Sequence, residues 1–379
     1  MPMPKSPMKI KPFWPAQRAC FAIAKNLRKA QTMDKPTMQH IVLSQRPEGP
    51  ARENHFRLET KPMPVPAQDD VLVELAYLSV DPYMRGRMDD VRSYAKPVAL
   101  GSTMEGGAVG RVIASRSASF EIGDYVMGPF GWASHGCCPA AHLRKLDTSI
   151  APISTALGVL GMPGFTGWYG FEKLGRPKHG ETLVVAAATG PVGSMVGQLA
   201  NAAGLRTIGI AGGAKKCALA IERFGFEQCL DHTAFATSKD LRAALKSACP
   251  DGVDIYFENV AGKVLEAVMP LMNTGGRIPI CGLISWYDEG ALGGHAAGGA
   301  QDNLPKFWRS ILVKRLSING FIISDHWALF DAFLADITPR VAAEEIRFYE
   351  DITEGLENAP KALTGLLNGQ NFGKQLIKL

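Results

Sequence analysis

The pattern of hydrophobic and polar positions changes near residue 165. Before that point, short apolar runs are broken by Gly and Pro, as is typical of β-strands. We expect strands at 39–43, 71–78 and 107–114. A turn followed by a strand is expected at 121–127, where Gly123 and Asp124 interrupt the apolar run. The first part of the chain is therefore predicted to form a β-rich domain.

After residue 165, strands and helices alternate with short connections. Strands are expected at 182–187, 206–211, 229–231, 252–258, 276–281 and 316–322, with helices between them, for example at 192–203 and 215–224. This alternation predicts an α/β fold with a doubly wound parallel sheet. Residues 327–379 hold helical runs and then a strand at 373–377, which we expect to return to the first domain. The Gly-rich stretch 290–300 is predicted to be a flexible loop.

Length and composition agree with two globular domains. The chain has 379 residues, of which 46% are hydrophobic and 20% charged, and this length predicts about two domains with substantial cores. The sequence contains no run of about 18 uncharged apolar residues, so it predicts no transmembrane helix. Seven Cys without a CxxC pair argue against a disulfide scaffold and favour a reducing, cytoplasmic environment.

The formal net charge of +5 is concentrated at the N-terminus. Residues 1–37 carry eight basic residues and one acid, a charge of +7, which leaves −2 for the rest. The body therefore has no basic stripe of the kind that binds nucleic acid. A basic amphipathic stretch at 21–30 is compatible with a transit peptide, or with a translation start at Met33 or Met38. We expect 1–37 to be a disordered leader without function.

The strongest chemical motif follows the predicted strand 182–187 and opens a helix. It has the form of a dinucleotide-binding turn with Ala188 in place of the first glycine. Gly190 lets the backbone approach a pyrophosphate, and Gly193 allows close packing of helix and strand. The helix N-terminus faces the negative charge. The predicted cofactor-binding residues of this turn are Thr189, Gly190, Pro191, Val192 and Gly193.

The next strand indicates which dinucleotide binds. An NAD site places a carboxylate after this strand to bind the ribose 2′-hydroxyl. Here 206–211 ends in Gly212 and Gly213, and Lys215 and Lys216 follow at the start of the next helix. A cation within reach of a 2′-phosphate favours NADP. The alternative is that both lysines are solvated surface residues.

No metal site is predicted. The eight His and seven Cys form no pattern with ligand spacing, and adjacent Cys137 and Cys138 suit tetrahedral zinc poorly, so structural thiols are expected there. Without a Lewis acid, reduction of an isolated carbonyl needs another strong electrophilic group to polarise the carbonyl. Hydride addition to a conjugated alkene needs less help, because a hydroxyl can stabilise the resulting enolate.

Four segments resemble a known family, in order along the chain. They are Asp-Pro-Tyr-Met-Arg-Gly-Arg-Met at 81–88, Leu-Gly-Val-Leu-Gly-Met-Pro-Gly-Phe-Thr at 157–166, Ala-Ala-Ala-Thr-Gly-Pro-Val-Gly at 186–193 and Tyr-Phe-Glu-Asn-Val at 256–260. Together they resemble the zinc-independent medium-chain dehydrogenase/reductase superfamily, in particular the branch of curcumin and prostaglandin (leukotriene) reductases. The resemblance covers residues 39–379.

This resemblance implies both a fold and an activity. The fold would be a GroES-like catalytic domain at 38–165, completed by 327–379, and a Rossmann domain at 166–326 that binds NADPH. Members reduce the carbon–carbon double bond of α,β-unsaturated ketones and aldehydes, commonly as homodimers.

The resemblance also assigns cofactor contacts, position by position. Lys216 matches the lysine that meets the 2′-phosphate, and His232 stands where relatives often have a Tyr near the adenosine. The remaining matches are Asn259 after the fourth strand, the nicotinamide loop (Cys281, Gly282, Leu283, Ile284, Ser285 and Tyr287), the carboxamide segment (Phe321, Ile322 and Ile323) and the late contact Asn371. Prostaglandin reductases have a Tyr after the sixth strand, where this chain has Ser324, Asp325 and His326.

Three tyrosines are candidate catalytic residues: Tyr83, Tyr94 and Tyr287. Each phenol could hydrogen-bond a substrate carbonyl, and each could instead be a packing residue. Arg85 and Arg87 are expected to be salt-bridge partners rather than substrate ligands. Trp168, Trp286 and Trp308 could line an apolar cleft, although core packing is the simpler interpretation.

The sequence thus predicts hydride transfer from NADPH to the β-carbon of an enone, with the enolate oxygen held by tyrosine hydroxyls. Two alternatives stay open. One is a quinone reductase of the same fold, and the other is a cofactor-binding module without catalysis.

Overall fold

The computed structural model describes residues 36–289 and 304–379. The leader predicted at 1–37 lies almost wholly outside the described residues, as does the loop predicted at 290–300. No helix within the described ranges is both long and apolar enough to cross a membrane.

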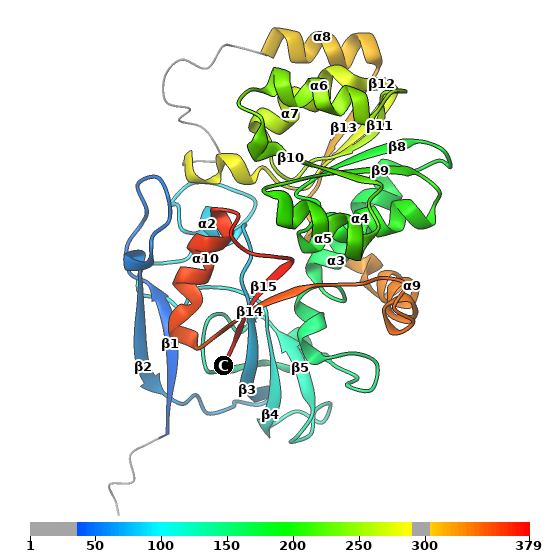
Figure 1. The fold of residues 1–379 in the computed structure, drawn as a ribbon. Helices are drawn as coiled ribbons and strands as arrows, with labels where there is room; N and C mark the ends of the chain where they lie inside the picture. The colour runs from blue at the N-terminus through cyan, green and yellow to red at the C-terminus, as the bar shows by residue number, and fades with distance from the viewer. Residues whose placement is uncertain (1–35, 290–303) are drawn as a thin grey trace, which may run out of the picture. The chain divides into compact units, whose positions relative to one another are not determined.

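A six-stranded parallel sheet forms the second half of the molecule, in the order β10-β9-β8-β11-β12-β13 (Figure 1). Its strands are β8 (Thr182–Ala186), β9 (Arg206–Ala211), β10 (Gln228–Asp231), β11 (Val253–Phe257), β12 (Met272–Ile280) and β13 (Ser317–Gly320). All six were expected from the apolar runs. The direction in which successive strands are added reverses between the neighbours β8 and β11: β9 and β10 follow on the side of β8, and β12 and β13 on the side of β11. Doubly wound sheets bind ligands at this point of reversal.

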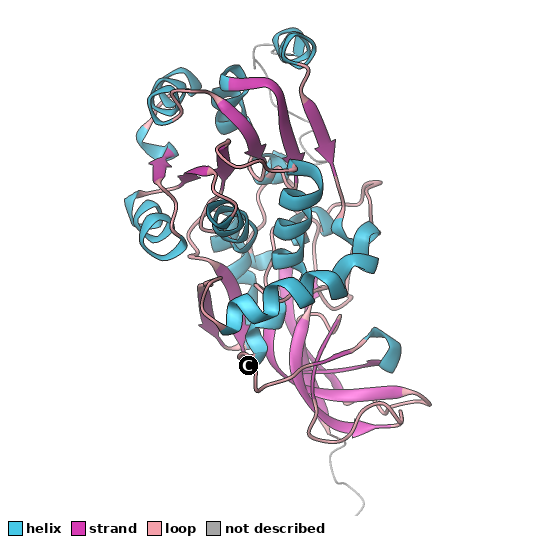
Figure 2. Cartoon of the chain, turned by 90° about the vertical axis from the view of Figure 1, so that its right-hand side faces the viewer, coloured by secondary structure: helices cyan, strands magenta, loops and turns pink. Residues whose placement is uncertain are grey.

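Helices cover both faces of this sheet (Figure 2). Every residue of β8 is buried, because a strand between two helical layers has no solvent side. Leu183 and Val185 pack in one core cluster with α3, α4 and α5, while Val184 and Ala186 pack in another with α6 and α7. The helices are α3 (Met162–Tyr169), α4 (Pro191–Ala202), α5 (Ala214–Phe224), α6 (Ser238–Ala248), α7 (Gly262–Val268), α8 (Leu304–Lys314), α9 (Phe330–Ala342) and α10 (Ala359–Leu367).

The first half is built on a seven-stranded sheet, in which six strands follow the order β14-β15-β3-β4-β5-β7 and the seventh, β6, pairs with β3. Its strands are β3 (Asp70–Ser79), β4 (Ala108–Ser115), β5 (Tyr125–Gly128), β6 (His135–Pro139), β7 (Arg144–Lys145), β14 (Glu350–Glu354) and β15 (Lys374–Lys378); β1 (Thr37–Leu43) and β2 (Phe56–Pro62) form a separate pair. β15 runs antiparallel to β3. The predicted return of the chain to the first sheet is therefore confirmed.

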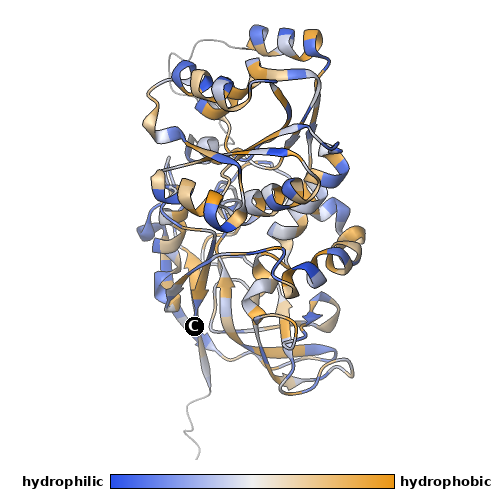
Figure 3. Cartoon of the chain, turned by 45° about the vertical axis from the view of Figure 1, so that its right-hand side comes forward, coloured by the Kyte–Doolittle hydropathy of each residue, from blue (hydrophilic) through white to orange (hydrophobic). Residues whose placement is uncertain are grey.

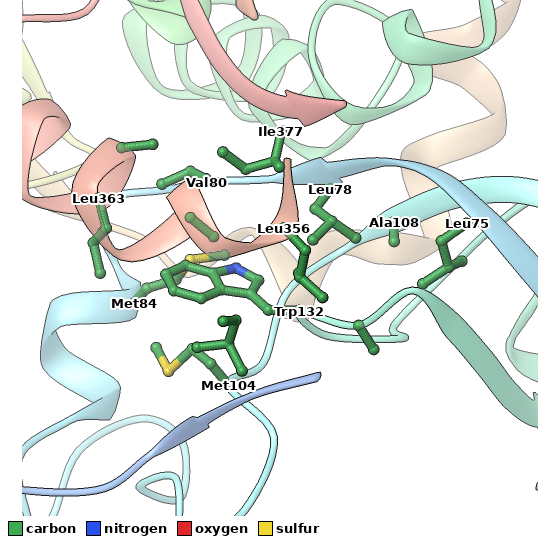
Figure 4. Packing of buried hydrophobic residues seen from close by; sticks show 14 of the residues in the cluster. Leu75, Leu78, Val80, Met84, Met104, Ala108, Trp132, Leu356, Leu363 and Ile377 are labelled. Atoms are coloured by element: carbon green, nitrogen blue, oxygen red, sulfur yellow. The ribbon is translucent and has the colours of Figure 1, made fainter. Parts of the chain in front are cut away.

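The core of this first half surrounds Trp132 (Figure 4). The fully buried indole lies among Met84, Met104 and Leu356, which come from segments far apart in the sequence. Met84 belongs to the short helix α2 (Met84–Arg87), so core packing fixes α2 in place. Coloured by hydropathy, the buried strands of both halves are mostly apolar (Figure 3). The predicted fold class, a GroES-like β domain with a Rossmann sheet, is confirmed.

Two buried histidines predict acid sensitivity. Burial lowers the pKa of His40 and of His55 below the ordinary value of 6.5. The His40 imidazole lies 2.8 Å from the Thr103 hydroxyl, and Nδ1 of His55 accepts from the Arg52 amide at 3.0 Å. Below about pH 6.5 the unfolded chain binds more protons than the folded one, so protonation favours unfolding.

We therefore expect the free energy of unfolding to fall as the pH drops below about 6.5. Urea denaturation at a series of pH values measures this slope. His40→Gln should flatten it, because glutamine does not titrate. A slope that is unchanged by His40→Gln would remove His40 from the explanation.

Candidate active site

The turn after β8 has the geometry of an anion cradle. Gly190 is the N-cap residue of α4 and Pro191 is its first residue, so the first amides of the helix are free to bind a negative group. At Gly193 an added Cβ would lie 2.3 Å from the Ala187 carbonyl oxygen, so a larger residue would push helix and strand apart. Ala187 itself has a φ of 53°, which turns the chain sharply out of the strand. These residues fit a dinucleotide pyrophosphate.

The ends of β11 and β12 bring further predicted residues to this turn. The Asn259 side-chain amide donates to the Ala186 carbonyl at 2.8 Å, which links the end of β11 to the end of β8. The Cys281 amide donates to the Glu258 carbonyl oxygen at 2.9 Å. Burial raises the pKa of the Cys281 thiol to about 12, so this thiol is protonated at neutral pH. Asn259 and the start of the nicotinamide loop thus lie at one sheet edge.

The residues predicted to contact the adenosine lie around the start of α5. The Asp231 carboxylate accepts from the Gly213 amide at 2.8 Å and from Thr233, so its Oδ1 already has internal donors. Lys216 donates to the Gly369 carbonyl at 2.6 Å. Burial, together with the ammonium groups of Lys263 and Lys216, lowers the pKa of His232. Lys216 and His232 therefore share one electropositive corner.

The remaining predicted cofactor contacts lie next to two strands: the carboxamide segment follows β13, and Asn371 lies in the loop before β15. The Phe321 ring packs at a tilt against that of Tyr169, with ring centroids 5.5 Å apart, and Ile322 and Ile323 follow it directly after β13. The Asn371 side-chain amide donates to Gly373 within its own loop, at 2.9 Å. The ammonium of Lys216 reaches this loop as well, 5.6 Å from the Phe372 ring centroid.

The three candidate tyrosines line one pocket. Tyr83 precedes α2, Tyr94 lies in the following loop, and Tyr287 lies in η7 (Ile284–Glu289), the turn of the nicotinamide loop. The half-open pocket has about 390 Å³ of empty space and is completed by Gly86, Arg87, Asp89, Val91 and Ser93. The three predicted tyrosines therefore line one pocket, while their catalytic role stays a prediction.

Arg87 lies with its guanidinium against two of the pocket tyrosines and is paired with a carboxylate. Its guanidinium lies 4.5 Å from the Tyr94 ring centroid and 5.5 Å from that of Tyr83, and its Nε donates to the Glu105 carboxylate at 2.6 Å. Burial raises the pKa of Tyr83, although the Arg87 charge opposes that rise. Burial also raises the pKa of Tyr287 to about 12. The phenols of Tyr83 and Tyr287 thus stay protonated and can donate hydrogen bonds at neutral pH.

Some contacts of these side chains could be predicted from the sequence, and others could not. Arg85 and Arg87 form the expected ion pairs, but the position of Arg87 against two tyrosine rings was not predicted. Its spacing of four residues from Tyr83 is the signal that could have indicated it. Trp168 packs in the core and donates to Asp336 at 2.8 Å, whereas Trp308 is 62% exposed on α8. Neither one lines the tyrosine pocket.

The fold and the site together define an NADP-type oxidoreductase with a separate substrate pocket. The chain belongs to the medium-chain dehydrogenase/reductase superfamily. Residues 39–146 match the family described as "N-terminal domain of oxidoreductase", and residues 191–338 match the family described as "Zinc-binding dehydrogenase".

Individual relatives cover nearly the whole chain. The NADPH-dependent curcumin reductase of Escherichia coli is 46% identical over 89% of this chain and 96% of its own length. The 2-alkenal reductase (NADP(+)-dependent) of Nicotiana tabacum is 41% identical over 82% and 87%. The crystal structure of CurA from Vibrio vulnificus in complex with NADPH superimposes with a TM-score of 0.84, at 45% identity over 90% and 98%.

The residues that the structure describes do not fit a zinc centre. Within them, no three His, Cys, Asp or Glu side chains gather in a way that could hold a metal ion. Cys137 and Cys138 are free thiols on β6, and burial raises the pKa of Cys138 to about 11. We derive no chemical step through a metal.

Proposed function

We propose that this protein is an NADPH-dependent reductase of the carbon–carbon double bond of α,β-unsaturated ketones and aldehydes. The observation that carries the proposal is the pocket lined by Tyr83, Tyr94 and Tyr287. Tyr287 lies in η7, which belongs to the same loop as Cys281, a predicted cofactor contact. The pocket is therefore next to the predicted cofactor site. The names of the Escherichia coli and Nicotiana tabacum relatives support the same reaction class.

The cofactor would be held by the chain in three places. The amides of Val192 and Gly193 at the start of α4 would bind the pyrophosphate, Lys216 would bind the 2′-phosphate, and Asn259 lies at the end of β11 beside the nicotinamide loop. When bound, NADPH supplies a hydride. The chain contributes orientation of the substrate and a low-dielectric environment, because the phenols of the pocket are largely buried.

The pocket residues stabilise charge on the substrate oxygen. When hydride reaches the β-carbon, negative charge develops on the carbonyl oxygen as the enolate forms. Tyr83 and Tyr287 can donate hydrogen bonds to that oxygen. A tyrosine or water then delivers the α-proton.

Product identity tests this function directly. The protein with NADPH and a simple enone should give the saturated ketone, identified by mass spectrometry and NMR. An allylic alcohol would contradict the mechanism even if the fold is right. NADPH oxidation that requires a quinone, and does not occur with any enone or enal, would instead support quinone reduction.

Removal of metal should not affect the activity, because the described residues offer no ligand set. Prolonged treatment with a strong chelator is expected to leave NADPH oxidation unchanged, and metal analysis should find no stoichiometric zinc. An activity that the chelator abolishes and zinc restores would show this prediction to be wrong.

We further propose that two copies associate as a homodimer. Among the described strands, β13 is one of the two edge strands of the six-stranded sheet, and α8, which leads into it, exposes Trp308, Leu312 and Val313 at 62, 78 and 59%. Such large apolar side chains favour burial against a partner. Light scattering of the protein and of its Trp308→Lys variant tests this association.

The proposal also includes a domain division and a compartment. Residues 38–165 with 327–379 would form the catalytic domain, and 166–326 the NADP-binding domain. The cysteines at 137, 138, 217, 229, 249 and 281 are free thiols, which supports a reducing compartment such as the cytoplasm.

A further inference from the structure

We propose that Arg85 and Asp288 are positioning residues, and that their ion pair holds Tyr287 against the α2 side of the pocket. This inference rests on the proposed function, since it takes the tyrosine pocket as the substrate site. Neither residue lies in the pocket lining. Their effect on the reaction would pass through the neighbouring residues.

Arg85 is a fully buried cation with partners in three segments. Its Nη1 donates to Asp89 at 2.7 Å and its Nη2 to the Gly49 carbonyl at 2.7 Å. Its Nε donates to Asp288 at 3.3 Å, across 203 positions of sequence. The guanidinium therefore connects the first half of the molecule to the nicotinamide loop of the second half.

This connection lies beside the pocket-lining residues on both sides. Tyr83 and Arg87 are each two positions from Arg85, at the two ends of α2. Tyr287 is the residue directly before Asp288. In Figure 1 the yellow turn η7 lies next to α2, as the ion pair requires. A shift of Asp288 away from Arg85 would thus move the Tyr287 phenol relative to that of Tyr83.

The two ends of η7 are held by different anchors. Its start is bonded to the Rossmann side, since the Ile284 amide donates to Asn259 at 3.2 Å and the Ser285 hydroxyl to Val260 at 2.6 Å. Near its end, Asp288 supplies the bond to Arg85. Because Tyr287 lies between these anchors, both are needed to fix its ring.

The geometry indicates which partner to change. Asp288 is one-third exposed, and Arg85 keeps Asp89 and Gly49 when Asp288 is neutralised. Removal of Arg85 would instead leave Asp89, which is 13% exposed, without its cation. Asp288→Asn is therefore the informative variant, because it keeps the side-chain size and the core bonds. Glu181→Gln is the matched control, because it removes a carboxylate from the buried Arg277 pair outside the pocket.

Hydrogen exchange tests the link without relying on activity. In Asp288→Asn, amides of peptides covering 284–288 should exchange about tenfold faster than in the unaltered protein, while Glu181→Gln should leave them unchanged. Unaltered exchange of these peptides in Asp288→Asn would overturn the proposal. This measurement stays decisive if the protein reduces no enone, an outcome that would overturn the proposed function alone.

Kinetics test the consequence for Tyr287. Asp288→Asn should lower kcat for an enone about tenfold and change KM for NADPH less than twofold, because a misplaced donor weakens transition-state stabilisation. In a Tyr287→Phe background the same change should cost less than twofold, because its effect passes through the missing hydroxyl. If Asp288→Asn lowered kcat equally in the unaltered and the Tyr287→Phe backgrounds, the effect would be a general structural one and the proposal would be overturned. The same conclusion would follow if Glu181→Gln lowered kcat as much as Asp288→Asn.

Discussion

Replacement of Tyr287 by Phe is expected to lower kcat for an enone by about 10²–10³-fold, the usual cost of removing one oxyanion donor. The Tyr287 hydroxyl oxygen lies 3.5 Å from the Leu283 amide, which can donate to it, so the hydroxyl proton remains available for the substrate. Burial raises the pKa of this phenol to about 12, which keeps the proton in place. Steady-state kinetics with a fixed enone measure the loss, and KM for NADPH should change little.

A matched control separates catalysis from packing. Tyr125 on β5 is 36% exposed and lies outside the pocket, so Tyr125→Phe should leave kcat unchanged. A packing role for Tyr287 would appear as a lower melting temperature with a nearly normal kcat, and that result would contradict the prediction. The pH profile provides a second check, because no loss of activity from ionisation of this tyrosine is expected below about pH 10.

Much of the fold could be predicted because local patterns determine it. The strands of the Rossmann sheet are apolar runs separated by glycines and amphipathic helices, and the turn at 188–193 needs small residues for a steric reason visible at Gly193. The strand pairing of β15 with β3 was predicted only as a return of the chain, without its register. The strands β2, β6, β7 and β14 were missed, because β2 and β14 are largely polar, β6 holds few large apolar residues and β7 has only two residues.

The candidate site was predictable in its residue types and only partly in its arrangement. Tyr83, Tyr94 and Tyr287 could be selected as hydrogen-bond donors, and the structure places them in one pocket. The bond between Arg85 and Asp288 joins residues 203 positions apart, so no local spacing could indicate it. The same holds for the bond of Lys216 to Gly369, which forms only when the C-terminal loop folds back on α5.

Replacement of Lys216 by Ala is expected to raise KM for NADPH by roughly 10- to 100-fold and to leave KM for NADH nearly unchanged. A charge-assisted bond to a phosphate contributes about 1.5–3 kcal/mol, and NADH lacks that phosphate. In the structure Lys216 bonds the Gly369 carbonyl and lies close to Phe372. The bond to Gly369 uses one of the three donors of the ammonium, so two donors remain for a 2′-phosphate.

The neighbouring Lys215 provides the control. It is exposed at the start of the same helix, so Lys215→Ala removes an equal charge without removing the proposed phosphate contact. If long-range attraction alone selected NADPH, the two variants would raise its KM equally, and higher salt would diminish the preference of the unaltered protein. A direct contact predicts that Lys216→Ala has by far the larger effect, because the half-buried Lys216 ammonium is less screened than the exposed one of Lys215. Equal turnover of NADPH and NADH by the unaltered protein would contradict both explanations.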